Sequence, residues 1–290
     1  MSSHYVNPSM SIQTLFDSLN PNEAHTVYIV NGVYREKLKL SNDNVTLIGE
    51  DQVKTQLTFN DYSYKMHDDG LLYNTFRTAT LTITGKNCKL KNLSIINDSG
   101  FGPTIGQAIA LSIYGDQTVI EHCLLHGYQD TLFIGPLPVD LTKRYAHILP
   151  LNERQPEMID VHLNDSIIEG NIDFIFGSGT ALFNHCQLIF NGSGYLAAPS
   201  TYEGHLGFVF NECQIVSLDP KFKTILARPW REFGKSYFIN CQIDSSINQT
   251  RYETWDKSNF DFAEYPAVKH ELSRVLSQSE LDQLLALFNK

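Results

Sequence analysis

The sequence predicts an all-β protein built as a parallel β-helix, a solenoid of stacked coils. One six-residue pattern occurs three times, at Phe183–Leu188, Phe210–Ile215 and Phe238–Ile243. Each copy begins with Phe and ends with Cys-Gln and an aliphatic residue. The copies are 27 and 28 residues apart, and a period of about 20–50 residues is typical of stacked repeats. Short β-branched runs fill the periods, and helical periodicity is nearly absent between Leu38 and Ile243. Short strands at a steady period without intervening helices predict a parallel β-helix.

Two weaker copies of the cysteine segment lie upstream, at Asn87–Leu90 and His122–Leu125. A cysteine that recurs at one position of every coil is expected to point inward and to form a ladder of small apolar side chains. The alternative is metal ligation, which the pattern disfavours because each coil supplies only one cysteine. Five cysteines without a Cys-X-X-Cys pair also fit neither a disulfide framework nor a zinc ribbon.

Short helices are expected to cover both ends of the solenoid, because an open terminal coil exposes unpaired strand hydrogen bonds. Apolar residues follow helical spacing near residues 10–20 and 278–289, and Ser277 with Glu280 gives a capping box at the second helix. No linker interrupts the chain, so we expect one domain over residues 1–290. Two stretches are expected to loop out of the solenoid, Asp61–Asn74 and the proline-rich Gly135–Pro156.

Composition and charge exclude or disfavour several classes of protein. The 290 residues are 42% hydrophobic and 19% charged, which excludes a disordered chain, and no apolar run approaches the ~20 residues that span a bilayer. The net charge of −10 disfavours nucleic acid, and also a polyanionic substrate unless a cleft concentrates basic groups. The first ten residues contain no secretory signal, so we expect a cytoplasmic protein if Met1 is native and a secreted one if a signal was removed.

One internal alignment brings two carboxylates together. The segment Cys123–Phe133 aligns with Ser166–Phe176, which matches Asp130 with Asp173 at an offset of 43 residues. If the two segments stack on adjacent coils, the carboxylates lie roughly 5 Å apart, the spacing of neighbouring strands. Two carboxylates at that distance cannot both ionise freely, so one is expected to hold a proton near neutral pH. The pair alone fits acid/base or nucleophilic chemistry and a purely structural or calcium-binding ladder about equally.

The neighbouring residues favour catalysis. Gln129 precedes Asp130 and Gln107 lies about one coil upstream, so two neutral amides are available to stabilise an oxyanion. Arg228 could keep one aspartate ionised, and Trp230 could form a flat platform for a sugar ring. Considered singly, a surface charge and a core aromatic residue are the simpler interpretations of these last two. A calcium site would require more anionic oxygens.

With these residues in this order, the chain resembles the pectin methylesterases. The resemblance covers roughly Val27 to Tyr265 and rests on six segments in the order that the family has them: Gly32–Glu36, Gln107–Leu111, Gly127–Phe133, Gly170–Gly177, Ala197–Thr201 and Leu226–Trp230. Six ordered segments are far more specific than any single motif. The resemblance implies a right-handed parallel β-helix that removes methyl groups from the C6 carboxylate of galacturonate units, without a metal or an organic cofactor.

The resemblance also implies roles for individual residues. Asp173 is the expected nucleophile, and Asp130 the general acid and then the base. Gln107 and Gln129 are expected to form the oxyanion hole, and Arg228 to orient and ionise Asp173. The substrate-binding positions are Trp230, Phe176, Phe133 and Ile172. The expected substrate is methyl-esterified homogalacturonan or its oligomers, and the expected protein is a monomer that binds neither nucleic acid nor membrane.

Two segments depart from the family pattern. Ala227 replaces a glycine before Arg228, and Pro266-Ala-Val replaces a Gly-Pro-Gly segment near the C-terminus. The alternatives are a carbohydrate-binding β-helix without catalysis, and a galacturonan lyase or glycosidase. The lyase would require a calcium-binding carboxylate cluster, and the glycosidase carboxylates placed about a glycosidic bond. A serine hydrolase is not supported, because no Gly-X-Ser-X-Gly segment occurs.

Overall fold

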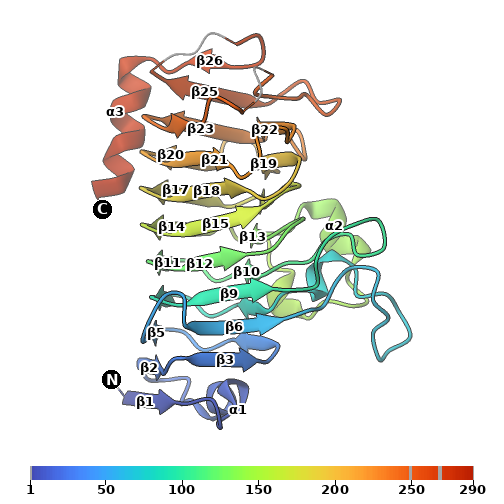
Figure 1. Cartoon of the computed structure of the whole chain (residues 1–290), viewed down its shortest axis with the longest axis vertical. Coiled ribbons are helices and arrows are strands. Elements are labelled where there is room, and N and C mark those ends of the chain that lie inside the picture. Colours follow the sequence, from blue (N-terminus) through green and yellow to red (C-terminus); the bar gives the residue numbers. More distant parts are fainter. Residues whose placement is uncertain (1, 248–249, 267–269, 290) are drawn as a thin grey trace.

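The chain winds into a parallel β-helix (Figure 1). The computed structural model describes residues 2–247, 250–266 and 270–289. Within these ranges the coils place their strands in three sheets of 11, eight and seven strands, and neighbouring strands of each sheet pair in parallel. The fold class that the sequence predicts is therefore confirmed. No helix in these ranges combines the length and the apolar character that crossing a bilayer requires.

Each sheet runs along the solenoid axis. The long sheet contains β1 (Ser2–Val6), β2 (His25–Ile29), β5 (Val45–Gly49), β8 (Lys89–Lys91), β11 (Thr118–Glu121), β14 (Asp160–Asn164), β17 (Thr180–Asn184), β20 (Phe208–Asn211), β23 (Lys235–Ile239), β25 (Asp261–Tyr265) and β26 (Arg274–Val275). The eight-stranded sheet contains β3 (Gly32–Arg35), β6 (Thr55–Phe59), β9 (Ser94–Asn97), β12 (Leu124–His126), β15 (Ile167–Gly170), β18 (Gln187–Phe190), β21 (Gln214–Ser217) and β24 (Gln242–Ile243). The seven-stranded sheet contains β4 (Leu38–Leu40), β7 (Leu81–Ile83), β10 (Leu111–Ile113), β13 (Leu132–Ile134), β16 (Ile175–Gly177), β19 (Gly194–Pro199) and β22 (Thr224–Ala227).

In most coils, one residue with a left-handed backbone forms the sharp corner between the long and the eight-stranded sheets. These residues have φ values of 48–59°, and each is followed by one inward-pointing residue that leads into the next strand: Asn92, His122, Asp165, His185, Glu212 and Asn240. Asn, Asp and His tolerate this conformation better than most side chains. The corner therefore explains the polar residue that stands before Cys123, Cys186, Cys213 and Cys241.

The predicted cysteine ladder forms inside this corner, with one correction. The strand registers on either side stack Cys123, Ser166, Cys186, Cys213 and Cys241 on successive coils. Cys88 does not belong to the ladder, because it lies at the entry to β8, one corner earlier in the coil. The five cysteines form no disulfide with one another, and four of them are buried. Beside the ladder, the rings of Phe183, Phe210 and Phe238 stack 4.6 and 4.7 Å apart in the core.

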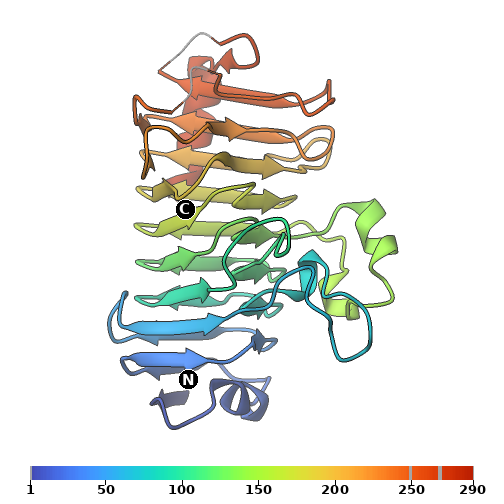
Figure 2. The same cartoon turned by 45° about the vertical axis from the view of Figure 1, so that its right-hand side comes forward.

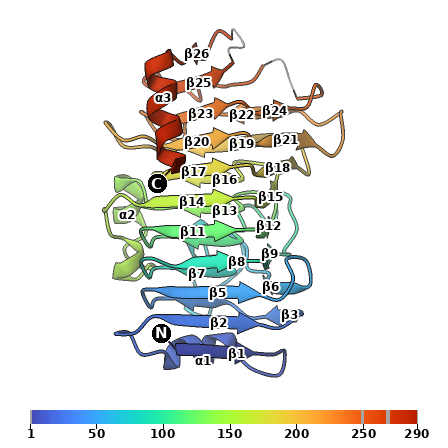
Figure 3. The same ribbon diagram turned by 90° about the vertical axis from the view of Figure 1, so that its left-hand side faces the viewer.

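Helices lie at both ends, as the apolar spacing predicts. Helix α1 (Ile12–Ser18) begins at an Ser11 cap and buries Ile12 and Phe16. Helix α3 (Gln278–Ala286) begins with the expected capping box and continues into a 3₁₀ turn over Leu287–Asn289. Figure 3 shows α3 lying across the long sheet near the C-terminal end, rather than only over its last coil.

Two long connections project on one side of the solenoid, where Figure 2 shows them facing each other. The first follows β6 and ends in a 3₁₀ turn over Thr75–Arg77. The second follows β13 and contains helix α2 (Val139–Arg144) and a 3₁₀ turn over Leu151–Glu153. The sequence predicts both departures from the solenoid, but it predicts only loop for residues 135–156 and misses α2.

Candidate active site

A cleft of about 390 Å³ lies on the outward face of the seven-stranded sheet, between the two long connections. Mostly polar and aromatic side chains from several coils and from both connections line it: Thr75, Phe76, Gln107, Gln129, Asp130, Leu141, Arg144, Tyr145, Asp173, Phe176, Ala198, Arg228, Trp230, Arg231 and Trp255. Of the nine site residues that the sequence predicts, seven are in this lining and two are not. In the described part of the chain, no group of three His, Cys, Asp or Glu side chains is placed to hold a metal ion.

Asp130 and Asp173 stand at matching positions of adjacent coils, as the internal alignment predicts. Each lies two residues before its strand, and the register of β13 with β16 keeps the 43-residue offset, for example in Leu132 opposite Ile175. Both have left-handed backbones, with φ of 66° and 50°, so both occupy sharp corners where the chain enters the seven-stranded sheet. The two residues are only 7% and 8% exposed. The β-helix thus brings two buried carboxylates from distant sequence positions to the floor of one cleft.

Arg228 forms a bidentate ion pair with Asp173. Its Nε donates to Oδ1 at 2.9 Å and its Nη2 donates to Oδ2 at 2.7 Å. This planar geometry is the strong form of an arginine–carboxylate interaction. Arg228 directly follows β22, two coils beyond Asp173 in the stack, and its side chain reaches back across β19. The contact that the sequence predicts is therefore present.

Two aromatic rings that sequence analysis missed hold the Arg228 guanidinium between them. Its Cζ lies 3.6 Å from the centroid of the Tyr195 ring and 3.8 Å from that of the Trp255 ring. Stacking on both faces fixes the plane of the guanidinium and so the direction of its donors. The register could have revealed Tyr195, because Ile175 pairs with Ala197 and this places Tyr195 one coil beyond Asp173. Trp255 lies outside the repeat, and no pattern identifies it.

The two carboxyls experience different electrostatic environments. Burial raises the pKa of Asp130 well above its ordinary value, and the charge of Asp173 raises it further. Burial also raises the pKa of Asp173, but the hydrogen bonds and the positive charge of Arg228 oppose that rise. The proton of the pair therefore resides on Asp130, and the negative charge on Asp173. This is a proton donor beside an anion, the arrangement that acid/base and nucleophilic chemistry need.

Gln107 and Gln129 line the cleft beside Asp130. The Ala108 N–H donates to the Gln129 carbonyl at 3.1 Å, so the two glutamines belong to adjacent coils. Ser63 fixes the Gln107 backbone from the other side, because its N–H donates to the Gln107 carbonyl (2.9 Å) and its Oγ accepts from the Gln107 N–H (3.2 Å). Ser63 belongs to the connection that follows β6 and was not predicted as part of the site.

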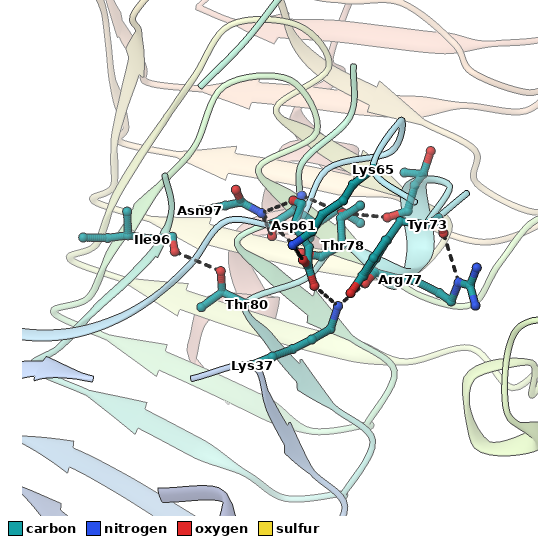
Figure 4. Close-up of polar contacts among 11 residues, drawn as sticks. Lys37, Asp61, Lys65, Tyr73, Arg77, Thr78, Thr80, Ile96 and Asn97 are labelled. Carbon is teal, nitrogen blue, oxygen red and sulfur yellow. Dashed lines mark hydrogen bonds and ion pairs between the residues drawn. The ribbon is translucent and has the colours of Figure 1, made fainter. Parts of the chain in front are cut away.

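An ion cluster around the buried Asp61 anchors this connection, as Figure 4 shows. Asp61 is 0% exposed and accepts hydrogen bonds from Lys37 Nζ (2.5 Å) and Lys65 Nζ (2.7 Å). Lys37 Nζ also donates to the Arg77 carbonyl. The Asn97 amide adds a hydrogen bond to the Asp61 carbonyl at 2.9 Å. Both ends of the segment that contains Ser63 are therefore held to the solenoid.

The aromatic predictions divide. Trp230 and Phe176 line the cleft and their ring centroids are 5.7 Å apart. Phe133 is fully buried behind them, against Phe176 and Phe76, so it supports the cleft wall and cannot contact a ligand directly. Ile172 is half-buried, lies next to Gly194 and does not line the cleft. Side chains of a strand alternate between its two faces, so the sequence indicates that Phe133 points outward from the sheet. The sequence does not show which other side chains cover that outward face.

Ala227 fits its position without strain. It is the last residue of β22, its Cα lies opposite that of Ala197, and it is not among the residues with positive φ. A methyl group there needs no special backbone conformation. The second departure from the family pattern cannot be placed in the same way, because residues 267 and 268 of Pro266-Ala-Val lie outside the described residues.

Comparisons with known sequences identify a family to which this chain is similar. A family profile described as Pectinesterase matches residues 10–136 and 161–266. A pectinesterase from Petunia integrifolia is 32% identical over 263 residues, which cover 84% of this chain and 62% of the relative. The probable pectinesterase/pectinesterase inhibitor 58 of Arabidopsis thaliana is 30% identical, with coverage of 82% and 38%. The chain thus spans less than two thirds of the length of these curated relatives.

Solved structures share the fold. A crystal structure of a pectin methylesterase in complex with a hexasaccharide superposes with a TM-score of 0.77 at 25% identity, over 94% of this chain and 90% of that one. The pectin methylesterase of Erwinia chrysanthemi has a TM-score of 0.79 at 24% identity, over 97% and 94% of the two chains. That of carrot reaches 0.78 at 18% identity, over 96% and 89%.

Proposed function

The chain belongs to the pectinesterase family, and on that premise we propose that it hydrolyses the methyl esters of galacturonate units in pectin or pectic oligomers. The observation that supports this most directly is the pair of buried aspartates in an open cleft. One of them is ionised by a stacked arginine and the other is kept protonated by burial. A neutral methyl ester can approach this site without the repulsion that a free carboxylate would meet from Asp173.

The proposed reaction uses the two aspartates in turn. Asp173 attacks the ester carbonyl carbon, and the amides of Gln107 and Gln129 donate to the oxyanion of the tetrahedral intermediate. Asp130 gives its proton to the methoxy oxygen, so methanol leaves and an acyl-enzyme anhydride remains. The Asp130 carboxylate then removes a proton from water, and the hydroxide attacks the anhydride carbonyl. This step releases the galacturonate carboxylate and restores both aspartates.

Arg228 acts on Asp173 and not on the substrate in this scheme. Its bidentate pair keeps the nucleophile ionised and leaves one carboxylate face for attack, while Tyr195 and Trp255 hold the guanidinium in plane. A binding protein without catalysis would have no need for this arrangement. A lyase would require a calcium-binding carboxylate cluster, and the described residues contain no group of three metal-ligating side chains.

The test is methanol release from methyl-esterified polygalacturonan and from its short oligomers. We expect the native protein to release methanol and Asp173→Asn to reduce kcat by at least about 10³-fold, because the nucleophile is lost. Asp165→Asn is the matched control, since Asp165 has a similar backbone φ (48° against 50°) but is exposed and outside the cleft. Substantial activity in Asp173→Asn, or an unsaturated product instead of methanol, would overturn the proposal.

A further inference from the structure

A second pair of polar side chains shares the register of the two aspartates, on the eight-stranded sheet. His126 lies four residues before Asp130. Glu169 takes the same place before Asp173, and it is opposite His126 in the pairing of β12 with β15. The His126 Nδ1 lies 3.1 Å from Oε2 of Glu169. Both side chains are half-buried and neither lines the cleft, so the proposed reaction leaves this pair without a role.

Asn191, which directly follows β18 on the next coil, joins this pair to the catalytic corner. Its Nδ2 donates to Oε1 of Glu169 at 3.2 Å and to the Gly127 carbonyl at 2.9 Å. Its backbone N–H donates to the Gly170 carbonyl at 3.0 Å. The Asn191 Oδ1 is buried and accepts no hydrogen bond from the described residues. The two contacts of Nδ2 therefore determine how the amide is oriented.

Glu169 is suited to hold this amide because it is ionised. The contact with His126 contributes most to lowering the pKa of Glu169, and the hydrogen bond from Asn191 adds to it, while burial opposes both. An ionised carboxylate accepts strong hydrogen bonds and donates none. His126 thus keeps Glu169 charged, and Glu169 keeps the donor end of Asn191 turned toward the Gly127 carbonyl.

The Gly127 carbonyl belongs to the corner that carries Gln129 and Asp130. Asp130 has a left-handed backbone, with φ of 66°, and a residue other than glycine stays in this region only where its surroundings hold it. At one end of the corner, the Asp130 N–H donates to the Ile172 carbonyl at 2.9 Å. At the other end, Asn191 holds the Gly127 carbonyl. The direction of the Gln129 side chain depends on both attachments.

We propose that Asn191 is a positioning residue for the reaction, and that Glu169 and His126 act through it. The inference rests on the proposed function, because it concerns how the corner is aligned with the same substrate. None of the three residues lines the cleft, so they act through the Gly127 carbonyl and not on the ester. Loss of Asn191 should lower the rate more than the affinity, since a misplacement of about 1 Å costs about 10²-fold in rate.

Methanol release from a methyl-esterified oligomer tests this series of contacts. We expect Asn191→Ala to lower kcat by about 10²-fold and to leave KM nearly unchanged. Glu169→Gln keeps an acceptor for the Asn191 amide and should retain most of the activity, whereas Glu169→Ala should lose about tenfold in kcat. The double variant Asn191→Ala/Glu169→Ala should be no slower than Asn191→Ala alone, because both substitutions act through one carbonyl.

Asn211→Ala is the matched control. Like Asn191, Asn211 donates through Nδ2, here to Asn184 Oδ1 at 2.7 Å, and its own Oδ1 is buried without a partner among the described residues. It lies in the long sheet and outside the cleft, so Asn211→Ala should lower Tm about as much as Asn191→Ala and leave kcat unchanged. Native kcat in Asn191→Ala, or an equal loss in Asn211→Ala, would contradict the inference. If Asn191→Ala does not fold, equal kcat values for Glu169→Gln and Glu169→Ala would contradict it instead.

Hydrogen exchange separates this inference from the proposed function. The Asp130 N–H should exchange about tenfold faster in Asn191→Ala than in Asn211→Ala, because one of the two attachments of its corner is lost. Equal exchange in the two variants would overturn the inference while the esterase activity stands. A native protein that releases no methanol would refute the proposed function, and the exchange rates would still decide whether Asn191 holds the corner.

Discussion

Asp130 and Asp173 contain the same functional group, yet their surroundings give them opposite charges. Both are nearly buried at left-handed corners of adjacent coils. Arg228 contacts only Asp173 and keeps it ionised, whereas Asp130 lies in the field of that charge and keeps its proton. Ionisable side chains that are buried for catalysis lower the stability of the folded protein. At the residue scale, the site should therefore be more stable when Asp130 cannot ionise.

We expect Asp130→Asn to stabilise the protein at pH 8 but not at pH 4. The folded state keeps the Asp130 proton at pH values where the unfolded chain has lost it, so the free energy of unfolding falls as pH rises between the two pKa values. Asn is neutral throughout and removes that loss. The gain in the free energy of unfolding should therefore be present at pH 8 and absent at pH 4. Urea unfolding at both pH values measures it, with the exposed Asp165→Asn as control; an equal change at pH 4 and pH 8 would contradict the assignment.

At the scale of elements, the connection after β6 holds the backbone of Gln107 in position. Asp61 and its two lysines fix its beginning, Arg77 and Asp69 pair near its end, and Ser63 contacts the Gln107 backbone in between. None of these residues reaches the two aspartates. Their effect on chemistry passes through the position of one amide, which makes them positioning residues and not catalytic ones.

Asp61→Asn should make local opening of this connection more frequent. Loss of the carboxylate leaves the Lys37 and Lys65 ammonium groups without their shared partner, so the local opening free energy should fall by about 1–3 kcal/mol, or roughly 5- to 150-fold in exchange rate. Hydrogen exchange at the Ser63 and Gln107 N–H groups measures this directly. Asp98→Asn is the control, because its pair with Arg35 is exposed and worth at most about 1 kcal/mol. Unchanged exchange in Asp61→Asn would show that the ion cluster does not hold the connection.

At the scale of the whole molecule, the solenoid has an outward apolar row that needs a cover. The register stacks Leu182, Val209, Tyr237 and Ala263 on successive strands of the long sheet. They are buried although their neighbours in β17, Ala181 and Phe183, point into the core. Helix α3 covers this row with Leu281 and Leu284. Such a row would otherwise be a large exposed apolar patch, which invites association.

Leu281→Ala should therefore destabilise the entire C-terminal half of the stack. The side chain is 4% exposed, and truncation of a buried leucine costs about 2–5 kcal/mol. Thermal unfolding and light scattering should show a lower Tm and earlier aggregation. Gln283→Ala, on the exposed side of the same helix, should change neither by much. A Tm for Leu281→Ala equal to that of Gln283→Ala would mean that α3 does not stabilise the sheet.

The repeat in the sequence determined the β-helix, because a stacked coil must place the same residue types at the same position in each turn. Because the coils stack in register, the 43-residue offset between Asp130 and Asp173 in the sequence is the same as the offset between paired residues of β13 and β16. The capping helices followed from their apolar spacing and from the Ser277 cap. These features share one cause: they follow from local sequence patterns, and a periodic fold places residues at equal spacing in the sequence next to each other on neighbouring coils.

Only the tertiary structure decided what lies outside that period. Trp255 reaches Arg228 from a segment beyond the repeat, and Arg144 enters the cleft on a helix that breaks the coil order. Phe133 is buried because Phe76, from a distant connection, covers it. Contacts of this kind depend on how irregular connections fold back over the sheet, and no residue spacing in the sequence encodes that path.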